Sequence, residues 1–190
     1  MSSSGKKRGA SGSAGSTSAS KKSMTEKDRT RDFNGWWALD LERSDTMEGY
    51  LRKMGMPDIP ILAALKMDKE QRTLQRFDIT ETGVEIRKRT RLNDKTQAHT
   101  FGEEEKSESI LGVKTQLAVY EKGELIITTH MPKIKGSGRM KLVERRYLEA
   151  EGDGHVMRQH MVLTDLSDSS TVDTNRYFTL SKPPAEDEDE

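Results

Sequence analysis

From Leu74 onward the sequence is a series of short segments in which apolar and polar residues alternate, with turn signals between them. The segments 81–83 (ETG), 93–94 (ND) and 121–123 (EKG) are typical of hairpin turns. No stretch between them has the pattern of a crossover helix, so consecutive strands are expected to pair antiparallel. Together with a strand near the N-terminus, the predicted strands are 35–42, 72–80, 83–92, 96–101, 105–111, 113–120, 124–131, 138–149, 155–164 and 171–180.

Two short helices are predicted between the first strand and the others. The first spans about 46–54, with Ser44 or Asp45 as its cap and Gly55 just after its end. Asp58 is expected to cap the second helix. Neither helix is long enough to be stable alone, so both are expected to lie on an apolar surface.

This order of elements predicts an all-β domain, a ten-stranded antiparallel up-and-down β-barrel with a two-helix lid. Such a sheet is expected to close, because closure removes its exposed edge strands. A closed sheet of this many strands usually has more interior than its own side chains fill. The strand count therefore predicts an internal cavity.

The charges divide the chain into three parts. Residues 1–32 carry eight Lys and Arg against three acids and almost no large apolar side chain, so they are predicted to form a disordered basic tail. Residues 183–190 end in EDEDE and are predicted to be a disordered acidic tail. The barrel is assigned to 33–182, where the charge is close to neutral, which argues against a nucleic-acid-binding module.

Other compositional features bear on the compartment. The chain has no cysteine, which excludes disulfides and thiolate zinc sites. It also lacks an apolar stretch of the length that a membrane helix or a secretory signal needs. These features predict a cytoplasmic protein, with the nucleus as an alternative if the basic tail acts as an address.

Short motifs resemble those of the intracellular lipid-binding proteins, the fatty-acid-binding-protein family of the calycin superfamily. Gly35, Trp37 and Leu39 match the Gly-x-Trp-x-Leu strand with which that family begins. The segment 46–56 (TMEGYLRKMGM) matches its first helix, including Tyr50. The segments 101–105 (FGEEE) and 117–127 (LAVYEKGELII) resemble two later turns, so the resemblance covers about 33–182 in both order and spacing.

The resemblance also implies a binding site. In that family an Arg and a Tyr two residues apart on the last strand hold a fatty-acid carboxylate, together with an Arg two strands earlier. Arg176 matches the first Arg, and Phe178 stands where the Tyr would be, without its hydroxyl. The earlier Arg would be Arg145 or Arg146, and Arg145 is favoured because Val143 and Tyr147 flank it on the same face. The predicted ligand-binding residues are Arg176, Arg145, Arg146, Phe178 and Tyr50.

A physical argument supports an anionic ligand independently of the resemblance. A desolvated Arg inside an apolar barrel needs an anion, and a bound carboxylate would form a charge-assisted pair with it. The opposing interpretation is that each Arg lies on the outer, solvated face of its strand. No sequence motif indicates catalysis, a metal or a cofactor.

The predicted function is non-covalent intracellular binding and carriage of a fatty acid or similar hydrophobic ligand by a monomer that is not an enzyme. Arg52, Lys53 and Lys66 on the lid predict transient contact with anionic membranes. One alternative is a ligand-free barrel acting as a protein-interaction module, its centre plugged by Trp36, Phe77 and Phe178. Another is a barrel enzyme or haem-type barrel of the nitrobindin kind, with His130 or His160 pointing inward.

Overall fold

The computed structural model describes residues 33–70, 73–90, 93–109, 112–135, 138–152 and 154–184. The predicted N-terminal tail and residues 185–190 of the acidic tail lie outside the described residues. The elements are β1 (Gly35–Asp40), α2 (Glu48–Lys53), α3 (Asp58–Glu70), β2 (Leu74–Ile79), β3 (Gly83–Arg89), β4 (Asp94–Thr100), β5 (Glu104–Ser109), β6 (Gly112–Glu121), β7 (Glu124–Pro132), β8 (Arg139–Glu151), β9 (Gly154–Asp165) and β10 (Thr171–Ser181).

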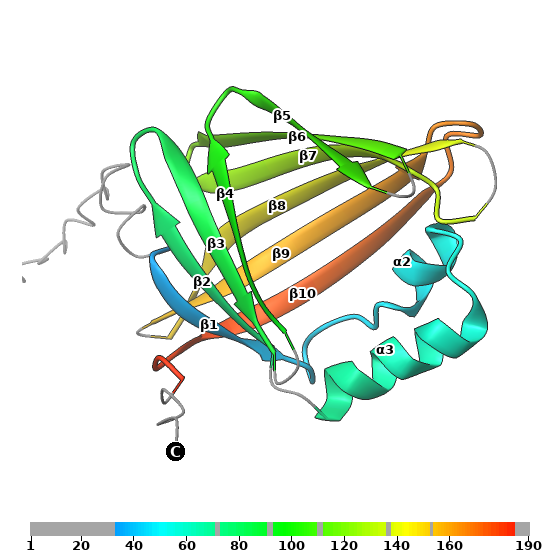
Figure 1. Cartoon of the computed structure of the whole chain (residues 1–190). Helices are drawn as coiled ribbons and strands as arrows, with labels where there is room; N and C mark the ends of the chain where they lie inside the picture. Colours follow the sequence, from blue (N-terminus) through cyan, green and yellow to red (C-terminus); the bar gives the residue numbers. More distant parts are fainter. Residues whose placement is uncertain are drawn as a thin grey trace, which may run out of the picture.

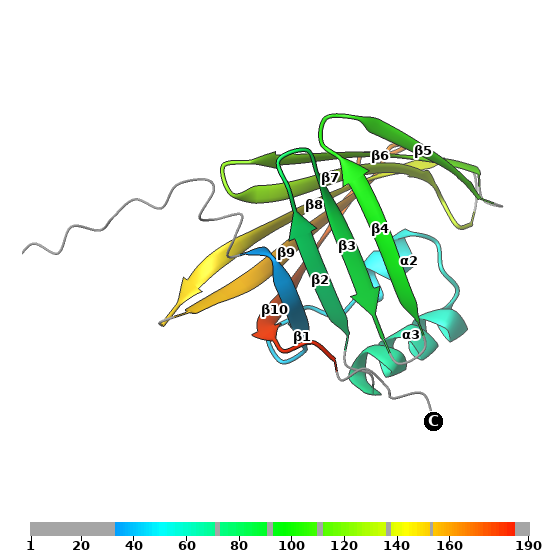
Figure 2. The same cartoon turned by 60° about the vertical axis from the view of Figure 1, so that its left-hand side comes forward.

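All ten strands form one sheet in the order β4-β3-β2-β1-β10-β9-β8-β7-β6-β5, and each neighbouring pair is antiparallel. The pairing of β1 with β10 joins the first strand of the chain to the last, and the sheet curls around a common interior (Figure 1). The helices α2 and α3 lie at the end of the barrel opposite the β8–β9 hairpin turn (Figure 2). The predicted all-β barrel with a two-helix lid is confirmed.

The sheet does not close completely. Among the described residues, β4 and β5 form no ladder with each other, although they are consecutive in the chain. Side chains cross this seam instead: Gln97 Nε2 donates to Gln116 Oε1 at 2.7 Å, and His99 Nδ1 lies 2.9 Å from Glu105 Oε2. The expectation of a closed sheet is therefore wrong at the β4–β5 seam, where side-chain contacts replace backbone pairing.

A core of large apolar side chains from β1–β3, β6, β7, β9 and β10 fills part of the interior. Trp37, Phe77 and Phe178 are each at most 1% exposed and belong to this core. The indole of Trp37 donates to the Phe33 carbonyl oxygen at 2.9 Å, so its one polar group is satisfied. Trp36, one residue earlier, belongs to a separate cluster and has the guanidinium of Arg87 over its ring. Trp36, Trp37 and Ala38 are all buried, so both faces of β1 are covered.

The first helix is shorter than predicted and begins differently. It starts at Glu48, and no side chain caps it. The predicted caps bond to β10 instead: Ser44 Oγ accepts from Tyr177 N at 2.9 Å, and Asp45 Oδ2 accepts from Asn175 N at 2.8 Å. The prediction of a cap at Ser44 or Asp45 is wrong because these side chains satisfy backbone donors of a strand.

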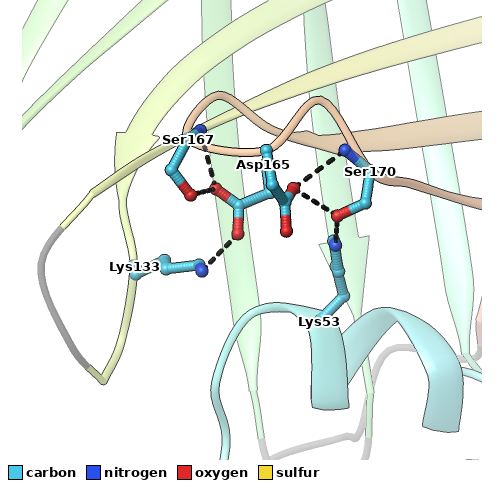
Figure 3. Close-up of polar contacts among 6 residues, drawn as sticks. Lys53, Lys133, Asp165, Ser167 and Ser170 are labelled. Carbon is cyan, nitrogen blue, oxygen red and sulfur yellow. Dashed lines mark hydrogen bonds and ion pairs between the residues drawn. The ribbon is translucent and has the colours of Figure 1, made fainter.

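Helix α2 is tied firmly to the barrel. Its Met54 end joins an apolar cluster with Met140 and Met161, and Met54 O accepts from Ile134 N at 3.0 Å. Lys53 donates to Ser170 Oγ in the β9–β10 loop (Figure 3). Gly55, at a φ of 83°, allows the chain to turn directly after this contact.

The β9–β10 loop that receives α2 is itself braced by Asp165. This buried carboxylate pairs with Lys133 and accepts from the Ser167 backbone and hydroxyl at 3.0 and 2.7 Å (Figure 3). These partners, Lys133 first, lower the pKa of Asp165 well below its ordinary value. The loop is therefore a fixed support for α2.

Helix α3 is attached much more loosely. Of its thirteen described residues only Ile61 is buried, while Ile59 and Leu62 are 81% and 66% exposed. The expectation that this helix lies on an apolar surface therefore holds only around Ile61. Neither of the two described helices is long and apolar enough to cross a membrane.

Candidate ligand-binding cavity

A cavity of about 440 Å³ lies inside the barrel next to the helices. Its volume falls within the range of about 300–1,000 Å³ that is typical of small-molecule sites. The apolar part of its lining includes Ile86, Ile127, Leu142, Met161 and Phe178, and the charged part is Asp68, Lys88, Lys95, Glu144, Arg146 and Arg176. The cavity contradicts the hypothesis of a barrel plugged by Trp36, Phe77 and Phe178.

Three polar side chains form a row across the cavity wall. Arg146 on β8 stands opposite Gln159 on β9, and Gln159 stands opposite Arg176 on β10. Opposite residues on paired strands have their Cβ atoms about 4.5–5.5 Å apart, so the two guanidinium groups enter the same region of the cavity. All three residues are at most 6% exposed. This row is the polar centre of the candidate site.

Arg146, and not Arg145, faces the interior. Arg146 is 5% exposed and lines the cavity, whereas Arg145 lies on the outer face, where its Nη1 is 3.4 Å from Glu124 Oε2. The preference for Arg145 was wrong because Val143 and Tyr147 belong to the outer face of β8, while Leu142 and Glu144 line the cavity. A shift of one residue exchanges the two faces of a strand.

The guanidinium of Arg146 is only partly satisfied. Its Nη2 donates to Glu144 Oε1 at 3.1 Å, and the same oxygen accepts from Gln159 Nε2 at 2.7 Å. Within the described part of the chain, its buried Nε and Nη1 have no hydrogen-bond partner. Unpaired buried donors on a cation are costly, so this side of Arg146 can accept an anion or another strong acceptor.

Arg176 faces the cavity as predicted, but it already has a counter-ion. Its Nη1 donates to Asp68 Oδ2 of helix α3 at 2.9 Å, and the Arg176 side chain is 8% exposed. Sequence reasoning missed Asp68. Its position seven residues after the buried Ile61 places it on the same face of α3, which is the pattern that could have revealed it.

The two remaining predicted residues also line the cavity. Phe178 lies on the same face of β10 as Arg176 and is 1% exposed, so the cavity has an aromatic ring where a hydroxyl was expected from the resemblance. Tyr50 of α2 enters from the lid side. Burial, with a smaller effect of Glu144, raises the pKa of Tyr50 to about 12, so its hydroxyl stays neutral at physiological pH.

Lys88 completes the group of cavity charges. Desolvation lowers the pKa of Lys88, although the residue as a whole is exposed. Asp68 and Glu144 act against that shift, while Arg176 and Arg146 add to it. With Lys88 protonated, four cations of the lining (Lys88, Lys95, Arg146 and Arg176) face the two carboxylates of Asp68 and Glu144, so the group has room for further negative charge.

The histidines proposed for a haem or enzyme site do not reach the cavity. His160 lies on the outer face of β9, where its Nε2 is 2.8 Å from Asp173 Oδ1. His130 alternates with the buried Thr129 and also lies outside the cavity lining. The hypothesis of an inward His130 or His160 is therefore wrong. Among the residues that the structure covers, no group of three His, Cys, Asp or Glu side chains could hold a metal ion.

Solved structures share this fold. A Schistosoma mansoni fatty acid binding protein in complex with arachidonic acid matches with a TM-score of 0.57 and 16% identity over 81% of this chain and 99% of that one. Lipid binding protein 8 of Caenorhabditis elegans matches with a TM-score of 0.54 and 18% identity over 80% and 96% of the two chains. A secretory abundant heat soluble protein of Ramazzottius varieornatus has a TM-score of 0.56 and 12% identity over 79% and 96%.

The likeness defines the fold class. The chain has the ten-stranded barrel with a helical lid of the fatty-acid-binding proteins, as its short motifs indicated. No protein-family model and no curated protein matches the sequence. Because one of the structures is described as a heat soluble protein, the fold by itself does not define a ligand. The residues that line the cavity bear more directly on a ligand than the fold does.

Proposed function

We propose that the barrel binds a single-chain amphiphile with an anionic head group, such as a fatty acid, without covalent chemistry. The buried Arg146 carries this proposal, because its Nε and Nη1 are unpaired among the described residues and belong to a side chain that lines the cavity. A carboxylate forms a charge-assisted hydrogen bond with such a donor and would add negative charge that the cavity group has room for.

The rest of the cavity suits the other end of an amphiphile. Ile127, Leu142 and Met161 line it with apolar surface, and Phe178 covers one side. Burial of an alkyl chain there would supply about 0.8 kcal/mol for each CH₂ group removed from water. The head group would fix the orientation, and the tail would supply most of the affinity.

The wider roles follow from this proposal. A protein that holds an amphiphile non-covalently would act as a carrier rather than an enzyme, as a cytoplasmic monomer that takes up ligand at membranes. The exposed Ile59 and Leu62 on α3 suit transient contact with a membrane surface. Arg52 forms ion pairs with Glu48 and Asp58. Apolar contact with the membrane would therefore matter more at this end of the lid than the charge of Arg52.

The test compares two neighbouring arginines in the full-length protein. Arg146→Gln should weaken oleate binding about tenfold or more, since charge-assisted hydrogen bonds are lost. Its matched control is Arg145→Gln, which removes the same charge from the outer face and should leave the affinity unchanged. Both are measured by isothermal titration with oleate and with oleyl alcohol, which has the same tail and no charge.

The outcome separates the parts of the proposal. Loss of oleate affinity in Arg146→Gln alone, with oleyl alcohol unaffected, would support an anion at Arg146. Equal loss in both variants would point to a general charge effect and contradict the site. A wild-type protein that binds neither probe would contradict the function of the cavity itself.

A further inference from the structure

The only ion pair that the described residues show between helix α3 and the barrel interior joins Asp68 to Arg176. It reaches from the lid to the inner face of β10, with 2.9 Å between Asp68 Oδ2 and Arg176 Nη1. The Asp68 side chain is 27% exposed and that of Arg176 is 8% exposed, so the pair sits at the mouth of the cavity rather than on the open surface. Both residues line the same cavity.

From this geometry we infer that Asp68 is an internal counter-anion that latches α3 over the cavity, and that an anionic ligand head displaces it from Arg176. The inference rests on the proposed function for the identity of the displacing group, but the latch itself can be tested without any ligand. It assigns to Asp68 a role in both ligand selectivity and lid release.

The contrast between the two helices shows why one ion pair can act as a latch. Helix α2 is held by the Lys53–Ser170 contact (Figure 3). The Met54 backbone and an apolar cluster also hold it. Helix α3 has Ile61 as its only buried residue among those described. Losing the Asp68 contact would therefore remove a large fraction of what attaches α3, while α2 would keep its other contacts.

The chemistry of the pair suits competition. The Asp68 carboxylate presents to Arg176 the same group that a fatty acid would present, so the two cannot occupy the same donor together. Binding of a carboxylate ligand then includes the free-energy cost of separating Asp68 from Arg176. The apparent affinity equals the intrinsic affinity multiplied by the fraction of molecules in which this pair is already open. A neutral amphiphile does not compete for Arg176 and leaves the latch in place.

Arg146 gives the ligand a way to begin this exchange. Its free donors lie in the same row as Arg176, with only Gln159 between them. A carboxylate that first pairs with Arg146 stands next to Arg176 and can take over its guanidinium as Asp68 leaves. The carboxylate would thus bind first to the unpaired donors of Arg146 and then compete with Asp68 for Arg176.

The first experiment measures the latch in ligand-free, full-length protein by amide hydrogen exchange of residues 58–70. Asp68→Asn keeps the size of the side chain and removes its charge, and exchange in α3 should become about fivefold faster or more, as expected for the loss of a coupling of ordinary size. The matched control is Glu70→Gln, which removes a carboxylate of the same helix whose partner is Lys66, also on α3. That control should exchange as the wild type does.

A double-mutant cycle identifies the partner. Arg176→Gln should release α3 to the same extent as Asp68→Asn, and the double variant should add nothing further. Additive effects would mean that the two residues act separately and would overturn the latch. Exchange in α3 that is equal in Asp68→Asn and the wild type would overturn it as well.

The second experiment tests displacement with oleate and oleyl alcohol. Asp68→Asn should bind oleate about fivefold more tightly than the wild type, with unchanged affinity for oleyl alcohol. Unchanged or weaker oleate binding by Asp68→Asn would overturn the competition. If neither protein binds oleate but α3 is released in Asp68→Asn, the fatty-acid function fails while the latch stands.

Discussion

Arg145 and Arg146 are adjacent in the chain, yet they lie on opposite sides of the barrel wall. Arg145 pairs with Glu124 on the outer face, and Arg146 is 5% exposed beside Glu144 and Gln159 in the cavity. The pleat of β8 thus converts one step along the chain into the difference between a solvated cation and a desolvated one. Of the two, only Arg146 has buried donors that lack a partner within the described part of the chain.

Restoring a hydroxyl at Phe178 should strengthen carboxylate binding. Phe178 lies on the cavity face two residues after Arg176, so a tyrosine there adds a donor close to the guanidinium. Phe178→Tyr should lower the dissociation constant for oleate roughly tenfold, because a hydrogen bond to a charged group contributes about 1.5 kcal/mol or more. Titration with oleyl alcohol should show a much smaller change.

The control for this variant is Tyr177→Phe, which removes a hydroxyl from the preceding residue, on the outer face beside Arg43 and Arg158. It should leave oleate affinity unchanged. Weaker oleate binding by Phe178→Tyr would mean that the head group does not lie near this part of β10.

Glu105 should matter for stability because it crosses the seam between β4 and β5. The His99 ring is 4% exposed, and its Nδ1 has Glu105 Oε2 as a partner at 2.9 Å. Glu105→Ala leaves that buried nitrogen without its acceptor or donor and should cost about 1–3 kcal/mol in the free energy of unfolding. Urea unfolding measures this loss, with Glu104→Ala on the exposed face of β5 as the control.

Hydrogen exchange would locate the effect. Faster exchange in β4 and β5 of Glu105→Ala, with β8 and β9 unchanged, is expected if the contact holds the seam together. A uniform change across the sheet would contradict a local role of Glu105.

Tyr50 should make the protein less stable at high pH. Burial raises the pKa of Tyr50 to about 12, above its ordinary value of 10.0. A raised pKa means that the contribution to stability is complete below pH 10 and is lost as the pH rises toward 12. At pH 11 the loss is about 1.4 kcal/mol from a shift of this size.

The comparison with Tyr50→Phe isolates this effect from other groups that titrate in the same range. The difference in the free energy of unfolding between pH 8 and pH 11 should be smaller in the variant by that amount. Equal pH dependence in the two proteins would show that Tyr50 is not desolvated.

Asp165 should stabilise the protein at neutral pH and lose this contribution at low pH. Lys133 and Ser167 lower its pKa, so its contribution to stability is present above the ordinary pKa of an aspartate and is lost as the pH falls below it. Asp165→Asn should therefore be less stable than the wild type at pH 7, and the gap should start to narrow as the pH falls below about 4. Thermal unfolding across this range, with Glu81→Gln in the β2–β3 turn as an exposed control, measures the difference. A gap that is as large at pH 3 as at pH 7 would contradict the assignment.

The strands could be predicted from the sequence because alternation is a local property. A period of two along Val84 and Ile86, or along Leu125 and Ile127, indicates a half-buried strand whatever its partner is. Turn residues at 81–83 and 121–123 then predict hairpins, and consecutive hairpins predict the meander. The order of elements follows from these local patterns, whereas the inward orientation of Arg176 was implied by the resemblance of the last strand to that of the fatty-acid-binding proteins.

Only the tertiary structure decided three other features. The choice between Arg145 and Arg146 depends on the register of β8 against β7 and β9, because a slip of one residue exchanges the faces of the strand. The open seam between β4 and β5 depends on how far the whole sheet curls, to which every strand contributes. The contact of Asp68 with Arg176 joins residues 108 apart in sequence, and it exists because α3 folds back over the cavity. Local patterns carry no information about such distant partners, so the polar chemistry of the site is set by packing.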